Sequence, residues 1–331
     1  MIVHKSNQAI PLPQDSPPQL IVVIDTEEEF DWGKPADRNS TSVEAMQYIN
    51  RVQDIFDEYG VTPCYVIDYP IASQEKSYKP LLNIYQDNRC EIGAHLHPWV
   101  TPPETEELKP ANTYPGNLEK TLEYEKLNNL TKVIQQNFDF DPVIYKAGRY
   151  GFGQNTETIL KELGYKIDLS FCPSVDHGYD GGPDYSDAHA QPFWFDDDKR
   201  LLEIPITGSF VGYAGSASKF LYNLAQAGKK IKMPGIFTRL GIVDRLVLSP
   251  EGFTPEEHIK ISKFLYDKGV RTFTWSFHSP TVMPGTTSYV TNEKELKKFL
   301  DSFHQYFDYF FNTMIGVATT PTKLKSQLES I

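Results

Sequence analysis

Apolar residues along this chain follow two patterns, short unbroken runs and longer stretches in which they recur every three or four positions. Unbroken runs are typical of strands that are buried on both faces of a parallel sheet, and the spaced pattern is typical of amphipathic helices. The clearest run, Leu20 to Ile24, leads directly into a cluster of acidic residues. Residues 40–59 show the spaced pattern and end at Gly60, a common helix stop.

The two patterns alternate through most of the chain. Repeated strand-then-helix units favour an α/β protein whose parallel sheet closes into a barrel. The longest predicted helices cover residues 118–138 and 293–312. Further strands are predicted at residues 61–67, 90–93, 142–146, 166–171, 201–206, 246–249 and 272–277.

Loops interrupt this alternation, and two segments flank it. Residues 1–19 contain four prolines and are expected to form an extended arm. Residues 316–331 are expected to form a C-terminal tail, which leaves a single barrel domain at residues 20–315. The predicted insertions in that domain lie near residues 101–116, 173–200 and 208–245.

Composition narrows the range of partners and compartments. The 331 residues include 44 acidic and 32 basic side chains, and the formal net charge of −12 argues against nucleic acid or an anionic membrane surface as partner. A neutral or cationic substrate is favoured. The three cysteines lack a CxxC spacing, so neither a disulfide framework nor a thiolate zinc site is predicted. Without a signal peptide or an apolar run of ~20 residues, we expect a soluble, cytoplasmic protein.

Reactive side chains follow four of the predicted strands. In barrels of alternating strands and helices, the active site lies at the carboxyl ends of the strands, so these side chains are expected to converge. They are Asp25 with Glu27, His95 with His97, Lys146 with Arg149, and His278.

The histidine pair is the candidate metal site. His95 and His97 are two residues apart and point to the same side if the segment is extended. With a carboxylate from Glu27 or Asp31, they would form a two-histidine, one-carboxylate site, the arrangement of catalytic zinc and of non-haem iron. The alternative is that one histidine only hydrogen-bonds the backbone around Pro98.

Acid–base roles can be suggested for the other strand ends. Asp25 is the candidate general base, since a neighbouring cation would keep it ionised; its alternative role is a helix cap or loop anchor. His278 is the candidate general acid or, alternatively, a structural histidine. Lys146 and Arg149 stand beside glycines and would orient Asp25 or hold an anionic group of the substrate. The alternative for these two cations is a surface ion pair.

Five segments of the chain resemble, in order, the motifs of the polysaccharide deacetylase family, the carbohydrate esterases with NodB homology. They read IDTEEEFDW, EIGAHLHPW, YKAGRYGFG, YKIDLSF and TWSFHSP. More narrowly, the chain is similar to the WalW-like branch of that family. It departs from the family pattern in three details: the acids are not adjacent aspartates, the histidines are two and not four apart, and Lys146 stands where the family has arginine.

The resemblance implies a distorted TIM-like barrel of seven or eight strands and a metal-dependent hydrolase that removes acetyl groups from a carbohydrate. One divalent metal, usually zinc, would polarise the acetyl carbonyl. Lys146 or Arg149 would orient the base, and Asp168 would support the acid. By position, the base is Asp25, the metal ligands are Glu27, His95 and His97, and the acid is His278.

Two other functions are compatible with the sequence. One is a catalytically silent carbohydrate-binding barrel, which the lysine at position 146 and the short histidine spacing favour. The other is a hydrolase of small non-sugar amides on the same fold. The insertions, which are expected to shape the cleft, carry no motif that selects one substrate.

Overall fold

A computed structural model describes residues 8–213, 218–227 and 242–331 of the chain. Its main sheet contains nine strands in the order β10-β1-β2-β3-β4-β5-β7-β6, with β11 paired to β1, and β8 and β9 form a separate two-stranded sheet. The strands are β1 (Gln19–Thr26), β2 (Cys64–Ile67), β3 (Glu91–Leu96), β4 (Ile144–Ala147), β5 (Ile167–Asp168), β6 (Phe193–Trp194), β7 (Leu202–Glu203), β8 (Gly208–Val211), β9 (Asp244–Val247), β10 (Thr272–His278) and β11 (Val317–Ala318).

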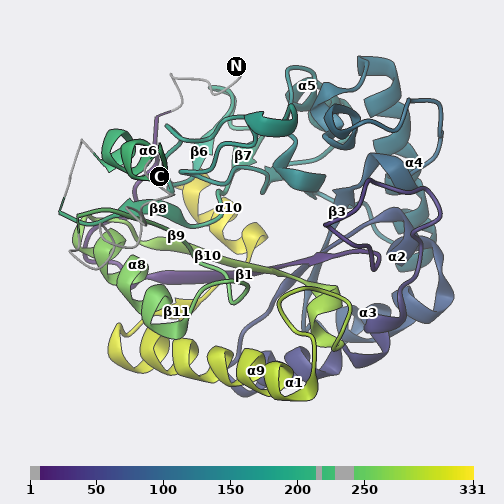
Figure 1. The fold of residues 1–331 in the computed structure, drawn as a ribbon. Coiled ribbons are helices and arrows are strands. Elements are labelled where there is room, and N and C mark those ends of the chain that lie inside the picture. The colour runs from purple at the N-terminus through teal and green to yellow at the C-terminus, as the bar shows by residue number, and fades with distance from the viewer. Residues whose placement is uncertain (1–7, 214–217, 228–241) are drawn as a thin grey trace.

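Helices surround the main sheet (Figure 1). No described helix has both the length and the apolar stretch that crossing a bilayer requires. The three cysteines are buried and unpaired. The helices are α1 (Asn50–Glu58), α2 (Tyr69–Ser73), α3 (Glu75–Gln86), α4 (Lys120–Phe138), α5 (Thr156–Glu162), α6 (Ser218–Ala227), α8 (Pro255–Asp267), α9 (Glu293–Phe307) and α10 (Pro321–Glu329).

Strand β1 contributes to two separate cores because successive side chains of a strand point to opposite faces. Val22 and Ile24 face outward and pack in the larger core, which includes the surrounding helices. Ile21 and Val23 face inward and pack in a smaller core that fills the barrel. Asp25 continues the inward series, so its carboxylate lies inside the barrel at the carboxyl end of the strand.

The seam of the barrel lies between β7 and β10. Here single hydrogen bonds replace a regular ladder: Thr207 N donates to Thr274 O at 3.1 Å, and Leu248 N donates to Thr207 O at 2.8 Å. Ser276 N in turn donates to Leu248 O at 3.2 Å. The curled sheet with this irregular seam confirms the predicted distorted barrel.

Several predicted elements differ in extent from the observed ones. β5 and β7 each contain two residues, and β9 pairs antiparallel with β8, outside the main sheet. Beyond the two paired residues the ladder becomes irregular: Phe171 N donates to the Glu203 carboxylate at 3.0 Å, and Ile206 N donates to Phe171 O at 2.9 Å. Within the predicted insertion at residues 208–245, the segments 214–217 and 228–241 lie outside the described residues, as do residues 1–7 of the predicted arm.

The segment predicted as a C-terminal tail belongs instead to the barrel. Val317 and Ala318 pair with the start of β1, and Leu324 and Leu328 of α10 are buried in the inner core. Gln327 accepts a hydrogen bond from Gln19 at the start of β1. Helix α10 therefore covers the amino ends of the strands, opposite the predicted site.

Replacement of Leu324 by alanine tests this role of α10. Deleting a buried leucine side chain leaves a cavity, so the free energy of unfolding should fall by about 2–5 kcal/mol. Urea titration followed by circular dichroism measures the change. Lys323→Ala, at an exposed position of the same helix, is the control and should alter stability by less than about 0.5 kcal/mol. A Leu324→Ala value as small as the control would contradict a structural role for α10.

Candidate functional site

Parallel pairing brings the four predicted strand ends together at one end of the barrel. β1 pairs with β10 so that Asp25 lies opposite His278, and β3 pairs with β4 so that His95 lies opposite Lys146. Lys146 alternates with Ile144, a residue of the inner core, and therefore points inward as Asp25 does. The pleat and the register together direct these side chains into one interior space.

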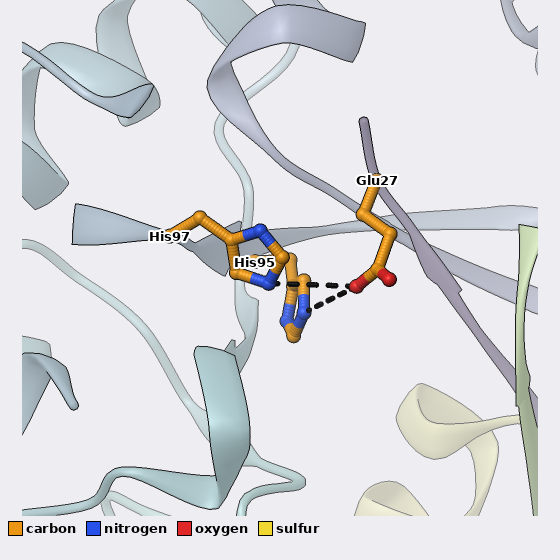
Figure 2. Close-up of side chains that lie close together, drawn as sticks. All are labelled: Glu27, His95 and His97. Atoms are coloured by element: carbon orange, nitrogen blue, oxygen red, sulfur yellow. Dashed lines mark ion pairs between the residues drawn. The ribbon is translucent and has the colours of Figure 1, made fainter. Parts of the chain in front are cut away.

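Glu27, His95 and His97 form a compact buried cluster (Figure 2). Oε2 of Glu27 lies 3.5 Å from Nε2 of His95 and 3.4 Å from Nε2 of His97. Among the described residues, no group hydrogen-bonds either carboxylate oxygen of Glu27 or Nε2 of His97. Such buried polar atoms are costly without a partner, and two imidazoles with one carboxylate are a donor set for a divalent cation. The residues present therefore fit a single metal ion.

The outer ring nitrogens of the histidines set the direction of the inner ones. Nδ1 of His95 lies 3.0 Å from the carbonyl oxygen of Lys146, and Nδ1 of His97 lies 2.8 Å from Oε2 of Glu28. Because a carbonyl only accepts, His95 donates from Nδ1 and its Nε2 keeps a lone pair toward Glu27. Gly148 leaves room for this packing, since a Cβ there would lie 2.5 Å from Cδ2 of His97.

Burial also keeps both imidazoles neutral, the state that binds a metal. It lowers the pKa of His95 well below its ordinary value and lowers the pKa of His97 to about 4, despite the neighbouring carboxylates. In the same cluster, burial raises the pKa of Glu27 well above its ordinary value. A cation bound among these three side chains would favour the ionised form of the Glu27 carboxyl and so offset the cost of burying its charge.

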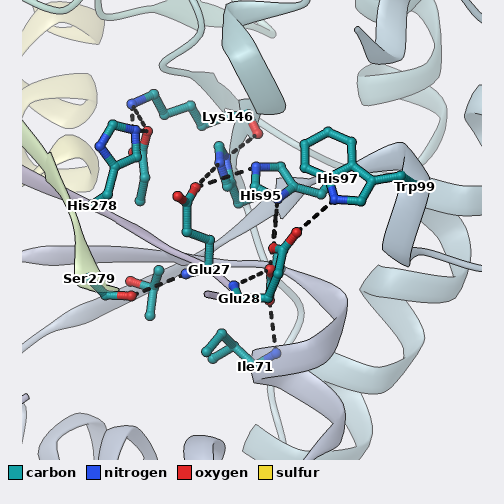
Figure 3. A network of polar contacts seen from close by, with 12 residues as sticks. Glu27, Glu28, Ile71, His95, His97, Trp99, Lys146, His278 and Ser279 are labelled. Atoms are coloured by element: carbon teal, nitrogen blue, oxygen red, sulfur yellow. Dashed lines mark hydrogen bonds and ion pairs between the residues drawn. The ribbon is translucent and has the colours of Figure 1, made fainter. Parts of the chain in front are cut away.

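A second layer of acids supports His97 (Figure 3). Oε1 of Glu28 accepts from the Trp99 indole N–H at 2.8 Å, and Oδ2 of Asp68 accepts from the backbone N–H of Glu28 at 2.8 Å. Burial and the adjacent Glu28 carboxyl raise the pKa of Asp68 well above its ordinary value. The sequence offered no role for Glu28 and did not single out Asp68, although Asp68 also follows a strand.

Asp25 forms a buried ion pair with Lys146. Nζ of Lys146 lies 2.6 and 2.7 Å from the two carboxylate oxygens and 3.3 Å from Oγ of Ser276. Burial raises the pKa of Asp25, but Lys146, His95 and His278 outweigh it, and the net pKa is lowered. Asp25 is thus ionised at neutral pH. The sequence left open whether Lys146 or Arg149 orients Asp25, and in the structure Lys146 is the one that contacts it.

Arg149 lies farther out, on the wall of the cleft. Its backbone has φ of 54°, in the left-handed region that non-glycine residues rarely adopt. The guanidinium donates to Thr113 and to the Asp180 carboxylate and lies over the Tyr114 ring at 4.3 Å. Two inserted loops therefore hold Arg149 in place.

Glu251 is the carboxylate that supports His278. Nδ1 of His278 lies 2.6 Å from Oε2 of Glu251, and the His278 backbone N–H donates to Oε1 at 3.2 Å. The hydroxyl of Thr281 also donates to Oε1. Burial lowers the pKa of His278, but Glu251 and then Glu27 and Asp25 raise it, and the net pKa is about 10. The inner Nε2 faces Oδ2 of Asp25 at 3.7 Å.

The prediction that Asp168 supports His278 is therefore corrected. Asp168 alternates with Ile167 and Leu169, which belong to the inner core, so its own side chain lies on the outer face of the sheet. There it accepts a hydrogen bond from Ser170 at 2.6 Å and pairs in register with Glu203 of β7. Glu251 follows β9 in a loop without a recognisable motif, so only its position in space identifies it.

A cavity of about 270 Å³ opens over this constellation. Exposed aromatic rings surround its mouth: Trp32 is 43% exposed, Tyr179 is 79% exposed and Tyr289 is 45% exposed. Trp32 and Arg149 also line a second cavity of about 590 Å³, in which Phe30 and Trp99 form part of the wall. The cleft is therefore longer than the space above the histidines.

Comparisons with known proteins agree on the fold. No family model matches the chain, and no curated protein matches it. Among solved structures, a candidate polysaccharide deacetylase from Mycobacterium smegmatis aligns with a TM-score of 0.56 and 14% identity, over 98% of this chain and 95% of that chain. A candidate polysaccharide deacetylase from Pseudomonas aeruginosa PAO1 aligns with a TM-score of 0.53 and 14% identity, over 94% and 90%.

The Puue allantoinase gives a similar alignment, with a TM-score of 0.52 and 14% identity over 94% of this chain and 90% of that chain. The chain therefore has the barrel fold that these structures share. Its likeness to the WalW-like branch stays a prediction from the motifs.

Replacement of Glu251 by glutamine should lower the pKa of His278 and change how stability depends on pH. In the metal-free wild type, the raised pKa of His278 stabilises the folded state fully below its unfolded value of ~6.5, and this contribution is lost as the pH rises to about 10. The variant should lose less stability over that interval. Proton NMR gives the pKa of His278, and urea unfolding at several pH values gives the stability.

Glu58→Gln is the matched control, because Glu58 faces His304 at 4.0 Å on the exposed surface. It should leave the pH dependence unchanged. An unaltered pKa of His278 in Glu251→Gln would show that Glu251 does not govern its protonation.

Proposed function

We propose that this protein is a metal-dependent hydrolase that removes acetyl groups from a carbohydrate. The observation that carries the proposal is the buried cluster of Glu27, His95 and His97 beside the ion pair of Asp25; both Glu27 oxygens and Nε2 of His97 have no hydrogen-bond partner among the described residues. The barrel fold shared with deacetylase structures supports the same reaction class.

The side chains of the cleft suit acyl transfer to water. A divalent ion such as zinc, held by Glu27, His95 and His97, would supply Lewis acidity toward the acetyl oxygen and make water more acidic. Asp25, kept ionised by Lys146, accepts the proton of the attacking water. His278, protonated at neutral pH, donates a proton to the nitrogen or oxygen that leaves the acetyl carbon.

The silent carbohydrate-binding barrel receives less support. It would be favoured if the two histidines pointed apart, but Nε2 of each faces the same oxygen of Glu27. The lysine at position 146 also retains a charged contact, since its ammonium bonds both oxygens of Asp25. Neither the short histidine spacing nor the lysine at position 146 separates the side chains of the site.

A small-amide hydrolase is the second candidate, because an allantoinase has the same fold. The length of the cleft favours the carbohydrate. The second cavity shares the lining residues Trp32 and Arg149 with the first and adds about 590 Å³ with aromatic walls. Aromatic faces of this kind stack on sugar rings, whereas a small amide would leave the space unused.

Metal content and acetate release test the mechanism together. The purified wild type should hold one zinc per chain, measured by elemental analysis, and His97→Ala should hold almost none. Asp25→Asn should retain folding, measured by circular dichroism, and lower kcat for acetate release by about 10²–10⁴-fold because the base is lost. Asp54→Asn, at an exposed position of α1, should match the wild type. Full acetate release by both Asp25→Asn and His278→Ala would refute the mechanism.

Trp32→Ala tests whether the substrate extends into the second cavity. Loss of the stacking surface should raise KM for an acetylated oligosaccharide about tenfold, which corresponds to ~1.4 kcal/mol, with little effect on a small acetylated amide. Steady-state kinetics on both substrates gives the comparison. Tyr48→Ala removes an exposed aromatic ring outside the cleft and serves as the control. Equal losses on both substrates would argue against an extended binding site.

A further inference from the structure

We infer that Ser170 and Asp168 position His95 through the peptide bond between Lys146 and Ala147. The inference rests on the metal site of the proposed function. Asp168, which the sequence associated with His278, would then act on the opposite side of the site, as a positioning residue for a metal ligand.

Three hydrogen bonds form the connection. Nδ1 of His95 donates to the carbonyl oxygen of Lys146 at 3.0 Å. The N–H on the other side of that same peptide, from Ala147, donates to Oγ of Ser170 at 2.8 Å. The Ser170 hydroxyl donates to Oδ1 of Asp168 at 2.6 Å.

The direction of donation is the same at every step, from His95 toward the Asp168 carboxyl. A peptide whose N–H is engaged by a good acceptor has a more strongly polarised carbonyl, so hydrogen bonds in such a chain strengthen one another. His95, Lys146, Ser170 and Asp168 are all at most 1% exposed, so water does not compete with these bonds. The peptide oxygen is thereby held in place and made a better acceptor for Nδ1–H.

The two histidines differ in the group that contacts Nδ1, and this difference explains why His95 would need the connection to Asp168. His97 has a carboxylate directly on Nδ1, from Glu28 at 2.8 Å. His95 has only a neutral carbonyl oxygen, and the carboxyl of Asp168 lies two hydrogen bonds beyond that peptide. Outer partners of metal-binding histidines fix the ring and raise its basicity, and here the backbone of β4 transmits that effect.

The same peptide also serves the catalytic base. It belongs to Lys146, whose ammonium bonds both oxygens of Asp25 at 2.6 and 2.7 Å. A peptide anchored by Ser170 therefore sets the orientation of His95 from its oxygen and limits movement of the residue that holds Asp25. Neither Ser170 nor Asp168 contacts His95 or Asp25 directly.

Zinc affinity of the metal-free full-length protein tests the inference. Zinc is titrated in competition with a chromogenic chelator into the wild type and into Ser170→Ala, Asp168→Asn and Ser262→Ala. Loss of a direct outer partner costs ~10–100-fold in affinity, so this more distant connection should cost about 3–10-fold in Ser170→Ala. Asp168→Asn keeps the shape of the acceptor and should cost less than Ser170→Ala.

Ser262→Ala is the matched control, because it also removes a fully buried hydroxyl with a side-chain hydrogen bond, to Tyr306 at 2.9 Å. It should bind zinc as the wild type does. The second readout is the Nδ1–H signal of His95 in nitrogen-15 NMR spectra of the metal-free protein. It should move upfield in Ser170→Ala and in Asp168→Asn and stay in place in the control, which a general loss of stability would not produce.

Unchanged zinc affinity together with an unmoved His95 signal in Asp168→Asn would overturn the inference, even if Ser170→Ala did not fold. Failure of the proposed function looks different: the wild type would bind zinc and the variants would weaken it, yet no acetylated sugar would release acetate. A wild type that binds no zinc would overturn both.

Discussion

The buried ion pair between Asp25 and Lys146 is the interaction on which the site depends. Removing two charges from water costs several kcal/mol per ion, and only close, well-satisfied contacts offset that cost. Here the ammonium bonds both carboxylate oxygens and Ser276, and in the described part of the chain no second carboxylate pairs with Lys146. The pair therefore locks the ends of β1 and β4 at a single spacing.

Other groups of the site are arranged around that spacing. The carbonyl oxygen of Lys146 receives Nδ1 of His95, and the register of β1 with β10 puts His278 next to Asp25. Each histidine then has its outer nitrogen engaged and its inner nitrogen directed into the cleft. The inner nitrogens of His95 and His97 face Glu27, and the inner nitrogen of His278 faces Asp25. The first group of side chains suits a bound cation, and the second suits proton transfer.

Alternation along the strands explains which predictions from the sequence agree with the structure. In β10, Phe273, Trp275 and Phe277 pack outward in the large core, so Ser276 and His278 face inward. The same alternation in β5 places the Asp168 side chain on the outer face of the sheet, because Ile167 and Leu169 belong to the inner core. Motif order alone associated Asp168 with His278, whereas the pleat separates them and leaves that position to Glu251.

The sequence by itself determined the alternation of strands and helices, the position of Asp25 at the end of a buried strand, and the two histidines on one side of an extended segment. These features depend on the local periodicity of neighbouring residues, which the order of amino acids displays directly. Only the tertiary structure decided that Lys146 and not Arg149 contacts Asp25, that Glu251 holds His278, and that β11 and α10 pack at the amino ends of the barrel strands. Those contacts join residues that are far apart in sequence, and they depend on strand register and loop paths that no local pattern encodes.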